Sequence, residues 1–143
     1  MIICLDTNAY SAIGRGNAAV AALVEEADQV VVPAIVMGEL VFGFLKGNQF
    51  PKNEAALNRF LGEDGVSLQP VTRDIAERYG YVKAALKAKG TPIPENDVWI
   101  AATALETGAR LVSFDTDFDH VGGLVRLAPQ PAAKATPPSR SSS

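Results

Sequence analysis

The amino-acid sequence predicts a single α/β domain in which helices cover both faces of a mostly parallel sheet. Short apolar or β-branched runs, typical of buried strands, alternate along the chain with longer segments in which apolar residues recur at helical spacing. No two strand-like runs are joined by a tight hairpin turn, which favours strands that run in the same direction. The length of 143 residues suits one domain with one core.

The opening residues predict a strand followed by two helical segments. Residues 2–5 are apolar and predict a short buried strand, which runs directly into Asp6. Residues 8–13 can then form a short helical turn, for which Asn8 is a suitable N-terminal cap. Asn17 opens an alanine-rich helix over residues 17–27, whose apolar residues are spaced by three and four positions.

The next segment predicts a second strand and two further helices. Residues 29–32 form a β-branched run typical of a strand. Residues 35–46 predict a helix that is apolar on nearly all sides, and we therefore expect it to be buried. Asn53 is the expected cap of the following helix, whose inner apolar stripe extends to Leu61.

A weaker strand, residues 66–71, comes before the clearest amphipathic helix of the chain. Either Thr72 or Asp74 can cap that helix, and Gly90 is the residue expected to end it.

The remaining ordered elements are a helix and two strands. Two prolines in residues 91–94 exclude a helix there, so we expect Asn96 to cap a helix over residues 97–107. Strands are then predicted over residues 110–114 and 124–127.

The chain changes in composition after residue 128. Residues 129–143 contain four prolines, four serines and no large apolar residue, which predicts a disordered tail after a folded domain of residues 1–128. The net charge of the whole chain is −3. Because Lys134 and Arg140 lie in the tail, which has no acids, the domain is more acidic still. A protein that holds nucleic acid by bulk attraction would be basic, so any nucleic-acid role must depend on a local site, metal ions or a basic partner.

Four acidic residues occur where a parallel sheet would bring them together. Asp6 and Asp115 directly follow predicted strands, Asp97 opens a helix after the extended proline segment, and Glu39 lies on an apolar helix face. Open α/β sheets bind ligands outside the carboxyl ends of their strands. Each acid alone has an ordinary explanation: Asp6 as a cap, Asp97 as a favourable charge in a first helical turn, Glu39 as a solvated residue and Asp115 as a loop acid.

Taken together, the acids favour a metal site. Two carboxylates about 5 Å apart repel by roughly 3 kcal/mol at an effective dielectric of about 20. A cluster of four therefore needs protons or a hard cation, and Mg²⁺ or Mn²⁺ is the natural partner of oxygen ligands. Such ions activate water for attack on a phosphodiester. Asp117 shares a strand direction with Asp115, so the choice between them stays open, with Asp115 favoured because it is nearer the strand end.

Other chemistries have little support. The single histidine, His120, excludes a histidine-rich zinc site, and no glycine-rich phosphate loop is present. Trp99 and Phe114 are expected in the core. The single cysteine, Cys4, lies in the first predicted strand, and a buried thiol without a disulfide partner fits a reducing cytoplasm. No apolar run is long enough to cross a membrane.

The chain resembles the PIN-domain nucleases over about residues 1–128. The resemblance depends on four segments in the family's order and spacing, which are Leu5-Asp6-Thr7-Asn8, Gly38-Glu39-Leu40, Asn96-Asp97-Val-Trp-Ile-Ala-Ala102 and Leu111-Val-Ser-Phe-Asp115-Thr-Asp-Phe118. Each segment alone is a weak signal, and the four in register are a strong one. Within the family, the length resembles the VapC toxins of toxin–antitoxin pairs.

The resemblance implies a fold, an activity and partners. A PIN domain is a three-layer α/β/α sandwich that cleaves RNA with Mg²⁺ or Mn²⁺, and a VapC toxin forms a homodimer that a small DNA-binding antitoxin of the VapB type inhibits. The four acids become the metal-binding residues. Thr7 and Ser113 become hydroxyl groups beside them, and Asn8 and Asn96, together with Asp117, become supporting polar groups. Phe114 stands where a polar residue is common in the family.

Two alternatives remain beside a metal-dependent endoribonuclease toxin. The first is a non-catalytic PIN-fold binding module that acts in a toxin–antitoxin repressor complex, although four intact acids favour the enzyme. The second is a phosphoacceptor domain of the receiver type. It would need an acidic pair near the first strand and a lysine after a late strand, and this chain has neither in place.

Overall fold

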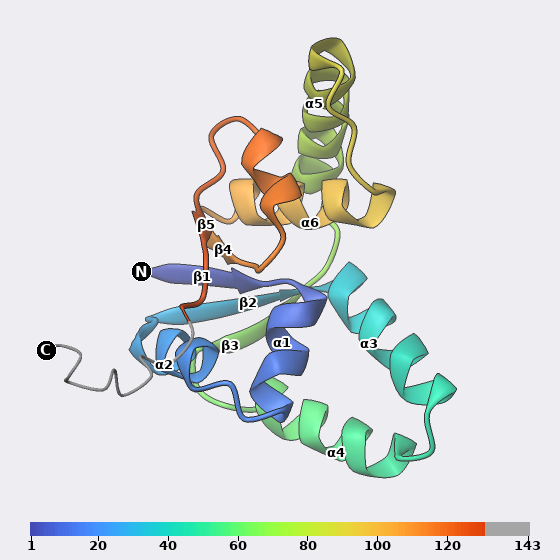
Figure 1. Cartoon of the computed structure of the whole chain (residues 1–143), viewed down its shortest axis with the longest axis vertical. Coiled ribbons are helices and arrows are strands. Elements are labelled where there is room, and N and C mark those ends of the chain that lie inside the picture. Colours follow the sequence, from blue (N-terminus) through green and yellow to red (C-terminus); the bar gives the residue numbers. More distant parts are fainter. Residues whose placement is uncertain (131–143) are drawn as a thin grey trace, which may run out of the picture.

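The computed structural model describes residues 1–130, and the predicted disordered tail lies almost entirely outside these residues. Within them, five parallel strands form one sheet in the order β3-β2-β1-β4-β5 (Figure 1). The strands are β1 (Ile2–Leu5), β2 (Gln29–Pro33), β3 (Val66–Gln69), β4 (Arg110–Val112) and β5 (Arg126–Leu127). The predicted parallel α/β architecture is confirmed.

Six α-helices and one 3₁₀ helix connect these strands within residues 1–130. They are α1 (Thr7–Gly14), α2 (Ala18–Glu26), α3 (Ala34–Lys46), α4 (Phe50–Leu61), α5 (Arg73–Lys89), α6 (Glu95–Glu106) and η1 (Thr116–His120). No helix among these residues is both long enough and apolar enough to cross a membrane.

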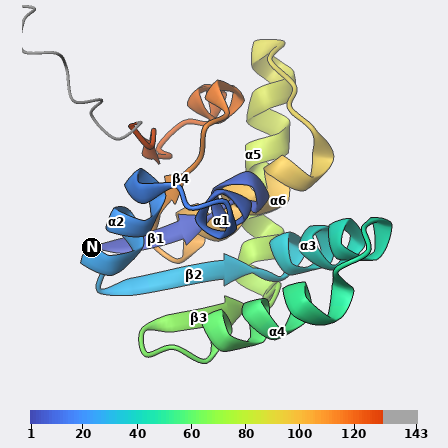
Figure 2. The same cartoon turned by 60° about the horizontal axis from the view of Figure 1, so that its bottom comes forward.

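Two hydrophobic clusters lie on opposite faces of the sheet, where they hold helices against it and so give a three-layer arrangement. Ile3 and Leu5 of β1 pack with residues of α1 and α2. Cys4, which points the other way because strand side chains alternate, packs with residues of α3, α5 and α6. Helix α4 lies beside α3 and the edge strand β3 (Figure 2). The sheet is therefore buried on both faces, as expected for a parallel sheet.

The register of the central strands determines where their last residues lie. Leu5 of β1 is paired with Val112 of β4, and the Asp6 amide donates to the Val112 carbonyl oxygen at 3.4 Å. The residues that follow these two strands, Asp6 and Ser113, therefore stand side by side at the carboxyl edge of the sheet.

Three predicted helix caps are wrong. Asp6, not Asn8, caps α1, because its carboxylate accepts from the Ala9 amide at 2.8 Å. Helix α4 begins at Phe50, ahead of Asn53, with a proline in its first turn, where a fixed φ suits a helix start. Helix α6 begins at Glu95, directly after Pro94, so that Asn96 lies inside its first turn.

Other local predictions hold, with shorter strands than expected. Asn17 accepts from the Val20 amide at 3.0 Å, and Thr72 rather than Asp74 caps α5. Gly90 ends α5 with a φ of 72°, a left-handed conformation that favours glycine. The strands predicted over residues 66–71, 110–114 and 124–127 are shorter in the structure, where they span Val66–Gln69, Arg110–Val112 and Arg126–Leu127.

Two burial predictions are wrong as well. Helix α3 is not buried on nearly all sides, because Phe42 and Leu45 are 62% and 64% exposed. Phe114 is not a core residue, since it is 43% exposed. Trp99 is half-buried and stacks on Tyr79, with ring centroids 3.9 Å apart.

Candidate metal centre

The four predicted acids line a single pocket at the carboxyl edge of the sheet. Asp6, Glu39, Asp97 and Asp115 share a hollow of about 310 Å³. They come from four separate elements: the end of β1, helix α3, the first turn of α6 and the segment between β4 and η1. Parallel strands bring these elements to one edge, which is why residues more than a hundred positions apart meet there.

Asp6 is the most deeply placed of the four acids. Its side chain is 6% exposed and accepts hydrogen bonds from the Ala9 amide at 2.8 Å and the Ser113 hydroxyl at 2.5 Å. Burial raises the pKa of Asp6, the two hydrogen bonds oppose that rise, and the charges of Asp115 and Glu39 add to it. The fully buried Ser113 hydroxyl also accepts from the Asp115 amide at 3.0 Å, so it links two of the acids.

Glu39 is half-buried and held by two polar side chains. The Thr7 hydroxyl donates to its Oε1 at 2.5 Å, and the Asn96 amide donates to its Oε2 at 3.1 Å. Predicted supporting roles for Thr7 and Asn96 therefore have a geometric basis. Asn8 is exposed and lines the same pocket.

The pKa of Asp97 is raised by its surroundings. Its pKa is raised from 3.8 to about 6, first by burial and then by the charges of Asp115, Glu39 and Asp6, with Asp117 contributing least. No hydrogen bond within residues 1–130 opposes that rise. The Asp97 carboxylate is therefore costly to ionise in the absence of a compensating cation.

The geometry separates Asp115 from Asp117. Asp115 lines the pocket, whereas Asp117 does not line it and lies exposed in η1. The Asp117 backbone amide donates to Asp115 Oδ1 at 2.8 Å, so Asp117 supports Asp115 through its backbone. These positions favour Asp115 as the fourth acid.

The donor set suits a hard cation, although the side chains do not yet surround one. Every acidic group in the pocket offers carboxylate oxygens, the ligands that Mg²⁺ and Mn²⁺ prefer. Among residues 1–130, no three His, Cys, Asp or Glu side chains are arranged so that they could hold a metal ion as they stand. The carboxylates would have to draw together around an ion, which would offset their mutual repulsion.

Three residues of α3 that line the pocket, Phe42, Gly43 and Lys46, were not predicted as site residues from the sequence. Phe42 and Lys46 line the hollow beside Glu39, three and seven positions further along the helix. This spacing places them on the face of Glu39, so helical periodicity could have identified them.

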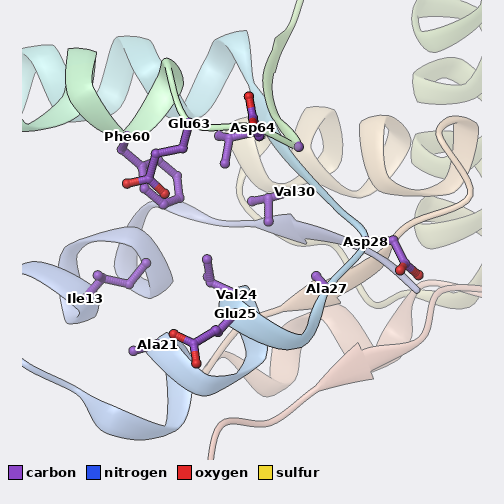
Figure 3. Close-up of a pocket in the computed structure, with 12 residues that line it drawn as sticks. Ile13, Ala21, Val24, Glu25, Ala27, Asp28, Val30, Phe60, Glu63 and Asp64 are labelled. Carbon is purple, nitrogen blue, oxygen red and sulfur yellow. The ribbon is translucent and has the colours of Figure 1, made fainter.

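A larger hollow lies elsewhere, at the opposite edge of the sheet. Its volume is about 350 Å³, and it is bordered by the starts of β2 and β3, with Phe60 in its wall (Figure 3). Glu25 and Glu63 lie on opposite sides of this hollow. None of the predicted site residues lines it, and parallel sheets bind ligands at the other edge.

A family model and the sequences of known proteins point to one family. The family model described as PIN domain matches residues 3–124. Ribonuclease VapC11 of Mycobacterium tuberculosis is 30% identical over 132 residues, which cover 88% of this chain and 96% of that protein. Ribonuclease VapC2 of Haemophilus influenzae is 33% identical over 89 residues, which cover 62% of this chain and 66% of that protein.

Solved structures agree with the fold described above. VapBC2 from Rickettsia felis, bound to a DNA fragment from its promoter, contains a chain with a TM-score of 0.79 and 26% identity, covering 89% of this chain and 98% of that one. VapBC-1 from nontypeable Haemophilus influenzae gives a TM-score of 0.77 at 26% identity, covering 89% and 97%.

Proposed function

The chain belongs to the PIN domain family, and from this premise we propose that it is a metal-dependent endoribonuclease toxin neutralised by a cognate antitoxin. The observation that carries the proposal is the shared pocket of Asp6, Glu39, Asp97 and Asp115. Curated relatives that match nearly the whole chain are named ribonucleases, and the similar solved structures are toxin–antitoxin complexes.

The proposed cofactor is Mg²⁺ or Mn²⁺, held by these four acids. Support comes from the all-oxygen donor set and from the raised pKa of Asp97, because a cation would stabilise the ionised carboxylates. When bound, such an ion activates water and neutralises charge that develops on the phosphodiester.

Neighbouring side chains orient the acids for this role. Ser113 holds Asp6, while Thr7 and Asn96 hold the two oxygens of Glu39. Carboxylates that are fixed in this way lose less conformational freedom when they bind an ion or a substrate. The hydrogen bond from the Ser113 hydroxyl also lowers the pKa of Asp6 and so offsets part of the rise that burial causes.

The proposed substrate is RNA, bound at a local site. With a net charge of −3, the chain does not attract a polyanion in bulk. The basic residues of α5 are largely engaged within the chain: Arg78 pairs with Glu106, Lys83 pairs with Glu95, and Lys89 donates to the His120 carbonyl oxygen. We therefore place the RNA contacts near the acid pocket, where metal ions can bridge phosphate and carboxylate.

The proposed partners are a VapB-like antitoxin and a second copy of this chain. An antitoxin that inserts Arg or Lys into the acid pocket would compete with metal and RNA. Exposed apolar side chains that a second copy could cover include Tyr81, which is 77% exposed on α5. Light scattering of the protein alone and with its antitoxin tests both assemblies. Action in the cytoplasm fits the RNA substrate and the fully buried free thiol of Cys4.

A second candidate function is a non-catalytic binding module in a repressor complex. One observation favours it: no three potential ligand side chains within residues 1–130 are arranged to hold a metal as they stand. RNA cleavage assays with Mg²⁺, Mn²⁺ and chelator separate the two functions. Metal-dependent cleavage that is lost in Asp97→Asn supports the enzyme, whereas a purified chain that cleaves no RNA with either metal supports the binding module.

A further inference from the structure

An aromatic ring and a lysine extend the acid pocket along α3. Phe42 lines the pocket and is nevertheless 62% exposed, the opposite of what a core phenylalanine shows. The Lys46 ammonium lies over the Phe42 ring, 4.9 Å from its centroid. Both residues follow Glu39 on the same helix face, so the ring and the ammonium group line the pocket next to the acids.

The charge of Lys46 stands out against its surroundings. It is the basic residue among those lining the pocket, and no salt bridge within residues 1–130 engages it. Its placement over an aromatic ring orients the ammonium beside the acids without neutralising it. A free cation next to a metal-binding pocket is well placed to contact a phosphate.

A glycine lies beside the ring in the wall of the pocket. Gly43, the next residue after Phe42, lies inside α3 and also lines the pocket. A Cβ added there would meet no atom within 4 Å, and its φ is not in the left-handed region, so neither packing nor backbone conformation requires glycine. Glycine in a helix interior is less stable than alanine. The helix surface at Gly43 is open, as it also is at Gly14, Gly38 and Gly80, and here the open space lies in the wall that Phe42 also lines.

We propose that Phe42 and Lys46 form a subsite for the nucleotide next to the scissile phosphate, with the base stacked on the Phe42 ring and a phosphate oxygen bound by the Lys46 ammonium. This inference rests on the proposed ribonuclease function. Single-stranded nucleic acid is held in this way elsewhere, by aromatic rings that stack on bases and cations that contact the backbone. Stacking tolerates any base, so the subsite sets the position of the strand and not its sequence.

A strand of RNA explains the ring better than a second protein chain. An apolar protein interface would cover Phe42 together with its neighbour Leu45, which is 64% exposed but does not line the pocket. Phe42 instead shares its hollow with four carboxylates and a lysine, a polar and charged lining. This difference between two equally exposed residues of one helix supplies a matched control.

The test compares Phe42→Ala, Phe42→Tyr, Lys46→Gln and the control Leu45→Ala. Each variant is assayed for cleavage of a single-stranded RNA with Mg²⁺ or Mn²⁺, and its mass is measured by light scattering. Base stacking of the usual strength predicts that Phe42→Ala raises KM by about 5- to 150-fold with a smaller change in kcat. Phe42→Tyr should restore KM, Lys46→Gln should raise KM and reduce its salt dependence, and Leu45→Ala should match the wild type.

A second substrate sharpens the result. An RNA that lacks one base next to the cleavage site should raise KM for the wild type, yet have no further effect on Phe42→Ala. Wild-type protein that cleaves RNA while Phe42→Ala keeps the same KM overturns the subsite and leaves the ribonuclease intact. A wild type without cleavage overturns both. Equal losses of activity and of mass in Phe42→Ala and Leu45→Ala would assign the ring to an interface between protein chains, which also overturns the subsite.

Discussion

Replacing Asp97 with asparagine should stabilise the metal-free protein near pH 8 and have almost no effect near pH 4. The pKa of this carboxyl is raised from 3.8 to about 6, mainly by burial and by neighbouring acids. Between these two values the folded state binds a proton that the unfolded state has released, so stability falls as the pH rises through this window. Asparagine cannot ionise and avoids this loss.

The structure limits the size of the gain. A carboxyl whose pKa rises from 3.8 to about 6 destabilises the fold by at most about 3 kcal/mol once it is ionised. Asp97 is only half-buried, and solvent screening reduces this figure to roughly half. Asparagine also loses a favourable charge in the first turn of α6, which contributes about 0.3–1 kcal/mol. We therefore expect a net gain of about 1 kcal/mol near pH 8.

Urea unfolding in chelator measures this gain for wild type, Asp97→Asn and Glu95→Gln. Glu95 lies in the same helical turn but outside the pocket, where it pairs with Lys83. Its substitution should lose up to about 1 kcal/mol near pH 8, the usual value of an exposed pair. Equal stability of Asp97→Asn and wild type near pH 8, or an equal gain at both pH values, would show that ionisation of Asp97 does not destabilise the fold.

Three further results are expected. Glu39→Gln should be at least as stable as wild type in chelator, because it removes one of the charges that raise the pKa of Asp97. Its rate of RNA cleavage should fall by orders of magnitude, and cleavage at the wild-type rate would show that Glu39 is not part of the site. Millimolar Mn²⁺ or Mg²⁺ should raise the melting temperature of wild type more than that of Asp97→Asn, and equal rises would show that Asp97 does not bind the ion. Ser113→Ala should destabilise the protein by about 1–3 kcal/mol, since it leaves the buried Asp6 carboxylate without one donor, and a melting temperature equal to wild type would contradict that role.

Much of the candidate site could be predicted because the sequence pattern indicates a parallel sheet. Strands alternate with helices, so residues that follow β1 and β4 must reach the same edge, and Asp6 and Ser113 are in fact neighbours there. Glu39 was identifiable because an acid on an apolar helix face needs a partner. The structure supplies those partners as Thr7 and Asn96, which come from two other elements.

Features that depend on tertiary context could not be predicted in the same way. Asn53 and Asn96 are good caps in isolation, but helix starts near Pro51 and Pro94 place both asparagines inside the first turns. An all-apolar helix does not reveal which of its sides meets the core, so the exposure of Phe42 and Leu45 follows only from how α3 packs.

We propose that the acid pocket cleaves RNA with a bound metal ion. The most direct measurement is the rate at which wild type, Asp97→Asn and Glu95→Gln cleave one single-stranded RNA, with Mg²⁺, with Mn²⁺ and with chelator. We expect metal-dependent cleavage by wild type and by Glu95→Gln, and a rate lower by orders of magnitude in Asp97→Asn. Cleavage that persists in chelator, or an Asp97→Asn variant as active as Glu95→Gln, would contradict it.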